Sequence, residues 1–73
     1  MKSERYQAYA DSFYPEMVEL KERGMTGDEI EKELRGWLDY ELDNFRRWDC
    51  IDQAEALERD YEDIVEYLMD ELI

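Results

Sequence analysis

The chain has 73 residues, of which 44% are hydrophobic, and its formal net charge at pH 7 is −13. This length allows one domain with a small core; the single cysteine excludes an internal disulfide, and the absence of histidine removes the commonest metal ligand. The negative charge disfavours direct binding to DNA, RNA or an anionic membrane, because like charges repel, and it favours a basic partner.

The first predicted helix covers residues 3–23. Its apolar residues recur at three- and four-residue steps, which places them on one stripe: Tyr6, Tyr9, Ala10, Phe13, Met17 and Leu20. Pro15 interrupts this pattern, because it has no N–H to donate and its ring disfavours helical angles at Tyr14. We therefore expect a kink or a break near residues 13–14, with Pro15 as the first residue of the second piece.

The clearest local signal lies between the first and second helices. Gly24 is expected to end the first helix, because glycine adopts the left-handed conformation without steric cost. Thr26 and Glu29 have the spacing of a capping box, and Met25 with Ile30 has that of a hydrophobic staple. Together these features predict where the second helix starts.

The second predicted helix covers residues 27–48. Its apolar stripe consists of Ile30, Leu34, Trp37, Leu38, Phe45 and Trp48. Two pairs of opposite charge lie four residues apart on its outer side, Glu31 with Arg35 and Asp43 with Arg47. The helix thus has one face for a core and one face for solvent.

The third predicted helix covers residues 52–72, with Asp52 as its N-cap and Glu55 as the capping-box partner. Its core stripe repeats with a period of about 3.6 residues and consists of Ala54, Leu57, Tyr61, Ile64, Val65, Leu68 and Leu72. No strand pattern, repeat or linker interrupts the chain. The sequence therefore predicts a single all-α domain over residues 1–73, a compact three-helix bundle whose first helix is kinked or split near Pro15.

Most of the negative charge lies in residues 49–73, which contain ten acids and one base, Arg59. At 100° per residue, six of these acids share one arc beside the core stripe: Glu55, Glu58, Glu62, Asp63, Glu66 and Asp70. Residues four apart rise about 6 Å along a helix, and two phosphate steps along a DNA strand rise about 6.8 Å. The arc can therefore imitate a short phosphate backbone. The alternative is that these acids only solvate the helix.

Glu41 is an unusual residue of the second helix, because it falls among the apolar residues of the stripe. A carboxylate buried there needs a partner. One interpretation is a structural bond to a tyrosine hydroxyl or to an arginine such as Arg5. The other places Glu41 at an interface with a partner or with a second copy of the chain.

Three tyrosines fall off the main apolar stripes, namely Tyr14, Tyr40 and Tyr67. Exposed aromatic side chains among charges make good interface anchors, so we count Tyr40 and Tyr67 with the partner-binding residues. Partial burial of these rings against a neighbouring helix is the alternative.

No group of residues supports catalysis, and we expect neither an enzyme nor a bound cofactor or metal. Cys50 has no histidine to activate it and is expected to be a small buried hydrophobic residue. The acids at Asp39, Glu41 and Asp43 lack the glycine of a calcium loop. No apolar run could span a bilayer, no signal peptide is recognisable, and a lone cysteine fits a reducing compartment, so we expect cytoplasmic localisation.

In size, charge and lack of catalytic residues, the chain resembles the small phage-encoded inhibitors of bacterial defence, the anti-CRISPR and anti-restriction proteins, several of which act as DNA mimics. The resemblance lies in overall character and involves no motif. It implies an inhibitor that blocks a Cas or restriction complex, in the host cytoplasm if the chain is phage-encoded. The sequence thus favours a binding protein whose acidic helix occupies the nucleic-acid groove of a basic partner. The alternative is a small structural or adaptor protein that docks or dimerises through an aromatic-rich apolar face.

Overall fold

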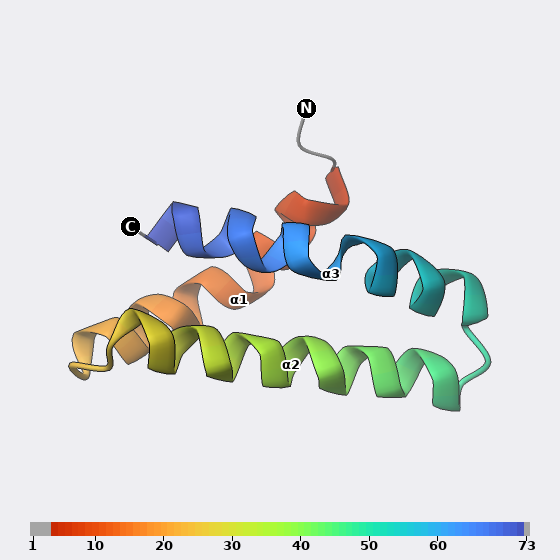
Figure 1. Ribbon diagram of the computed structural model, residues 1–73, viewed down its shortest axis with the longest axis horizontal. Helices are drawn as coiled ribbons and strands as arrows, with labels where there is room; N and C mark the ends of the chain where they lie inside the picture. The colour runs from red at the N-terminus through yellow and green to blue at the C-terminus, as the bar shows by residue number, and fades with distance from the viewer. Residues whose placement is uncertain (1–3, 73) are drawn as a thin grey trace.

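The computed structural model describes residues 4–72, and the side chains of residues 6–71, as three helices (Figure 1): α1 from Glu4–Glu22, α2 from Gly27–Arg47 and α3 from Ile51–Leu72. No strand occurs within this range. Figure 1 shows α2 and α3 as an antiparallel hairpin, with α1 running obliquely across it, and α1 contacts both other helices. The predicted all-α three-helix bundle is confirmed, with helix ends within one residue of those expected.

The core lies where the apolar stripes of the three helices meet. Its buried side chains are Ala10, Met17, Ile30, Leu34, Leu38, Ala54, Leu57, Ile64, Val65, Tyr67 and Leu68. Burying one aliphatic side chain of this kind stabilises the fold by about 1.5–3 kcal/mol. Aromatic rings extend the core at its edge, where Phe13 lies 5.5 Å from Trp37 between ring centroids. The predicted stripes are therefore confirmed at most positions, although the side chain of Leu72 lies outside the described residues.

Of the two alternatives at Pro15, a kink or a break, the break is wrong, because α1 is one helix with Pro15 in its interior. Pro15 leaves the carbonyl of Asp11 without its usual backbone donor, a change that costs an isolated helix about 3 kcal/mol. The turns on either side of Pro15 are each fixed to the core, by Ala10 before it and Met17 after it. Packing of both turns against the core thus outweighs the tendency of proline to interrupt a helix.

The turn after α1 has the geometry that the sequence predicts. Gly24 has φ of +91°, and the N–H groups of Gly24 and Met25 donate to the carbonyls of Lys21 and Leu20 in a Schellman motif. The Thr26 N–H donates to the Glu29 carboxylate at 2.9 Å, and the Glu29 N–H donates to Thr26 Oγ1 at 3.2 Å. The capping box is therefore confirmed.

The turn between α2 and α3 repeats the Schellman motif without a glycine. Asp49 takes the left-handed position with φ of +60°. Its N–H donates to the carbonyl of Arg46 at 3.3 Å, and the N–H of Cys50 donates to that of Phe45 at 2.7 Å. Helix α3 then begins at Ile51, which places Cys50 at the capping position.

Three expectations at this turn are wrong. Asp52 does not cap α3 but lies in its first turn, where a negative charge interacts favourably with the helix dipole. Trp48 does not join the core, because α2 ends at Arg47 and Trp48 occupies the C-cap with φ of −98° and ψ of 17°. The turn directs the indole outward, and Trp48 is 74% exposed. Cys50 is half-buried rather than buried.

Candidate partner-binding surface

The six predicted acids of α3 divide into two groups in the structure. Glu58 and Glu62 lie beside α2 and are paired with its arginines, Glu58 with Arg46 and Glu62 with Arg35. Arg59 is the only base of α3 itself, as the sequence shows, but two arginines of α2 also reach these acids. Sequence spacing misses both pairs, because they depend on how α2 and α3 dock.

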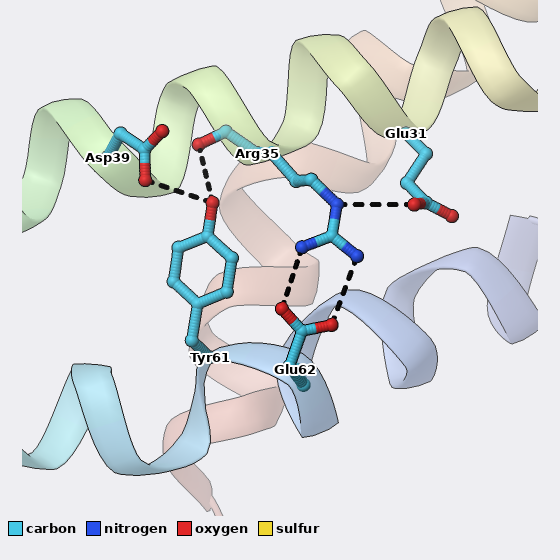
Figure 2. Close-up of polar contacts among 5 residues, drawn as sticks. All are labelled: Glu31, Arg35, Asp39, Tyr61 and Glu62. Atoms are coloured by element: carbon cyan, nitrogen blue, oxygen red, sulfur yellow. Dashed lines mark hydrogen bonds and ion pairs between the residues drawn. The ribbon is translucent and has the colours of Figure 1, made fainter.

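Arg35 is the centre of the polar contacts between α2 and α3 (Figure 2). Its guanidinium donates two hydrogen bonds to Glu62, at 2.8 and 3.0 Å, and one to Glu31 at 3.1 Å. The ring of Tyr61 lies 5.8 Å from the guanidinium carbon. The Tyr61 hydroxyl is within donating distance of the Arg35 carbonyl, at 3.0 Å, and of the Asp39 carboxylate, at 2.9 Å. The predicted Glu31–Arg35 pair is thus one arm of a larger cluster.

These contacts shift the titration of the groups involved. Hydrogen bonds from Arg35 lower the pKa of Glu62, and the bonds to Glu62 and Glu31 raise the pKa of Arg35. Burial raises the pKa of Tyr61, and its hydrogen bond to Asp39 adds to this effect. At neutral pH, Arg35 and Glu62 are therefore charged and Tyr61 is neutral. The cluster therefore links α2 to α3.

The other four predicted acids, together with Asp52, point away from the core and form what we call the outer carboxylate face. Its members are exposed and, within the described part of the chain, make no ion pair or hydrogen bond: Asp52, Glu55, Asp63, Glu66 and Asp70. From the first to the last, the face extends about 27 Å along the helix axis at 1.5 Å per residue. Arg59 lies among these residues, and its Nε donates to Asp60 at 3.3 Å.

Tyr40 and Glu41 lie on α2, and only one of them occupies the environment expected. Tyr40 is 67% exposed, in agreement with the sequence. Glu41 is half-buried, so its carboxylate is not a charge sealed in the core. No tyrosine hydroxyl bonds to Glu41 within the described residues, and the side chain of Arg5 lies outside them.

Tyr67 is a core residue, so its predicted exposure is wrong and the alternative, burial against a neighbouring helix, is confirmed. It is only 8% exposed, its ring centroid lies 6.0 Å from that of Tyr6, and its hydroxyl donates to Gln7 Oε1 at 3.0 Å. The reason is that α3 packs against α1 as well as α2, which widens its buried face beyond a single stripe.

One further feature was missed by the sequence reasoning. An open pocket of about 230 Å³ lies between α1 and the C-terminal turns of α3. Its lining residues are Gln7, Ala10, Asp11, Tyr14, Pro15, Tyr67 and Glu71. Neither helix alone signals this pocket, because it forms only where the two helices meet.

No family model, curated protein or solved structure matches this chain. Among the described helices, none combines the length and apolar character needed to cross a membrane. Within the same part of the chain, no three carboxylate or thiol side chains are grouped so as to hold a metal ion.

Proposed function

We propose that the chain is a non-catalytic binding protein, an inhibitor that inserts the outer carboxylate face of α3 into the nucleic-acid-binding groove of a basic partner protein. The observation that supports this proposal is the division of the α3 acids. Glu58 and Glu62 are used within the fold, whereas the acids of the outer carboxylate face make no ion pair or hydrogen bond among the described residues.

A fixed helix makes such a face effective for binding. Helix α3 carries Leu57, Ile64 and Leu68, each fully buried, so its outer acids are held on a packed scaffold. A partner does not have to order these groups on binding, which removes part of the entropy cost of association. A groove built for phosphates already presents lysine and arginine side chains, so steering by opposite charge is strong.

The outer face also has a local cost. Like charges four residues apart, such as Glu66 and Asp70, destabilise a helix by about 0.2–0.5 kcal/mol per pair. A helix that needed only solubility could alternate lysine with these acids at no such cost. The resemblance in size and charge to phage-encoded inhibitors of bacterial defence suggests a Cas or restriction complex as the class of partner.

Capture followed by competition tests the proposal. Tagged protein is immobilised, exposed to a bacterial lysate, and eluted with short duplex DNA or guide-like RNA. We expect nucleic-acid-binding proteins to be retained and then displaced by the nucleic acid, and retention to fall steeply with salt. Retention that nucleic acid does not displace contradicts the proposal.

A charge-reversed variant assigns the binding to the outer face. Glu55→Lys, Glu66→Lys and Asp70→Lys combined should abolish the DNA-displaceable capture. The matched control carries three exposed acids of α1 and α2 changed in the same way, Glu16→Lys, Glu22→Lys and Glu33→Lys. The control should keep most of the capture, because it alters net charge equally and leaves the outer face intact.

A second candidate, docking or dimerisation through an apolar face, is favoured by one observation at the α2–α3 turn. Trp48 is 74% exposed and Ile51 is 50% exposed, only three residues apart. Large apolar side chains exposed together are a feature of interfaces. Sedimentation at low and high salt separates the candidates, since apolar self-association persists in salt and is lost in a Trp48→Ser, Ile51→Ser variant.

A further inference from the structure

The pocket between α1 and α3 combines aromatic and acidic side chains in its wall. Two tyrosines, Tyr14 and Tyr67, and two acids, Asp11 and Glu71, line it, and none of its described lining residues is basic. Pockets for drug-sized ligands have volumes of about 300–1,000 Å³. At about 230 Å³, this one suits a single side chain.

A chain of hydrogen bonds holds one acidic wall in place. The Tyr67 hydroxyl donates to Gln7 Oε1 at 3.0 Å, and Gln7 Nε2 donates to Asp11 Oδ1 at 3.0 Å. A carboxylate has about four acceptor positions, so Asp11 can accept further bonds. Pro15 also lines the pocket, and its lack of an N–H removes the usual donor to the Asp11 carbonyl. Asp11 therefore keeps side-chain acceptor positions at this wall, and its carbonyl lacks the usual helical donor.

We propose that this pocket receives the guanidinium group of an arginine side chain from the basic partner. A guanidinium is planar, carries five N–H donors, is weakly hydrated and stacks on aromatic rings. Carboxylates of Asp11 and Glu71 can accept its hydrogen bonds, while Tyr14 and Tyr67 supply aromatic wall. Charge-assisted bonds of this kind are about twice as strong as neutral ones.

The pocket borders the outer carboxylate face, so one partner can contact both. Residues three and four apart are neighbours on a helix, and Tyr67 is therefore adjacent to Asp63 and Asp70 of that face. The inference deepens the proposed function and depends on it for the source of the arginine. The affinity of the pocket for a guanidinium group does not depend on it.

Titration of the full chain with N-acetyl-arginine amide, followed by NMR, tests the pocket directly. We expect saturable shifts at the Gln7 side-chain amide and at the backbone amides of Asp11 and Glu71. The neutral citrulline analogue should produce no saturable shift, because it keeps the shape and loses the charge. The lysine analogue should bind more weakly, because an ammonium group cannot stack or form a bidentate bond.

Paired variants give the control for electrostatics. The double variant Asp11→Asn, Glu71→Gln should raise the Kd for arginine at least about tenfold. A tenfold change in Kd corresponds to a binding free-energy difference of about 1.4 kcal/mol. Glu22→Gln with Glu33→Gln removes the same charge from exposed positions outside the pocket and should change the affinity less than about twofold. Circular dichroism of all four substitutions in the full chain verifies that the helices persist.

Three results overturn the inference: shifts that do not concentrate at the pocket, equal binding of arginine and citrulline, or equal weakening by the two paired variants. These results are separable from a failure of the proposed function. If arginine binds the pocket while charge reversal of the outer face leaves partner capture intact, only the proposed function fails. If partner capture depends on the outer carboxylate face but N-acetyl-arginine amide does not bind the pocket, only this inference fails.

Discussion

Arg35 on α2 and Glu62 on α3 are joined by two parallel hydrogen bonds, Nη1 to Oε2 at 2.8 Å and Nη2 to Oε1 at 3.0 Å. This fork-to-fork geometry fixes the relative position of the two helices more tightly than a single bond would. Because Glu62 is 73% exposed, solvent and salt weaken the attraction between the charges. The pair therefore defines how α2 and α3 align more than it adds to the stability of the fold.

The Arg35–Glu62 pair should make stability depend on pH. Arg35 lowers the pKa of Glu62 in the folded state. A carboxyl group with a lowered folded pKa stabilises the fold above its unfolded value of about 4.3, and this contribution is lost as pH falls through the folded pKa. We expect Glu62→Gln to unfold at lower urea concentration than the original chain at neutral pH, with the difference disappearing in acid.

Urea unfolding over a series from neutral to acidic pH measures this effect. Asp63→Asn is the control, because it removes a neighbouring exposed charge without breaking a hydrogen bond in the described part of the chain. A stability difference for Glu62→Gln that persists unchanged to the most acidic pH would show that its loss acts through packing, not through ionisation.

Asp49→Gly should stabilise the protein. Asp49 has φ of +60°, a left-handed conformation that glycine adopts without the steric cost imposed by a Cβ atom. We expect the free energy of unfolding to rise by about 0.5–1 kcal/mol, measured by urea titration. Asp49→Asn removes the charge and keeps the side chain, so it separates the effect of backbone strain from that of charge.

At the other turn, Gly24→Ala places a Cβ atom on a residue with φ of +91° and should lower the free energy of unfolding by about 1 kcal/mol.

The two tryptophans should respond differently to substitution. Trp37 is half-buried with its ring 5.5 Å from Phe13, whereas Trp48 is 74% exposed. We expect Trp37→Ala to lower the free energy of unfolding by about 2–3 kcal/mol and Trp48→Ala to change it by less than about 0.5 kcal/mol. Iodide quenching in Trp37→Phe and Trp48→Phe checks the exposure independently, since only the fluorescence of Trp48 should be strongly quenched. Equal quenching of the two would contradict the structure at the α2–α3 turn.

The features predicted correctly from sequence are those set by local spacing. Thr26 and Glu29 cap α2 because their separation along the chain alone brings them together. The positions of Trp48 and Tyr67 could not be predicted this way: the first depends on where α2 ends, and the second on a third helix packing beside α3. The same holds for the division of the α3 acids, because the partner of Glu62 lies 27 residues away in the sequence.

Glu66→Lys should separate stability from partner binding. Glu66 has three acidic helix neighbours: Glu62 and Asp70 four residues away and Asp63 three residues away. Replacing its charge converts repulsive pairs into attractive ones, so the free energy of unfolding should stay equal or rise by about 0.2–0.5 kcal/mol per pair. DNA-displaceable partner capture should nevertheless fall, because the middle of the outer carboxylate face becomes basic. Glu33→Lys on α2 makes the same change in net charge and should leave capture intact. If both variants capture the partner equally well, the acids of α3 serve solubility and the proposed interface is wrong.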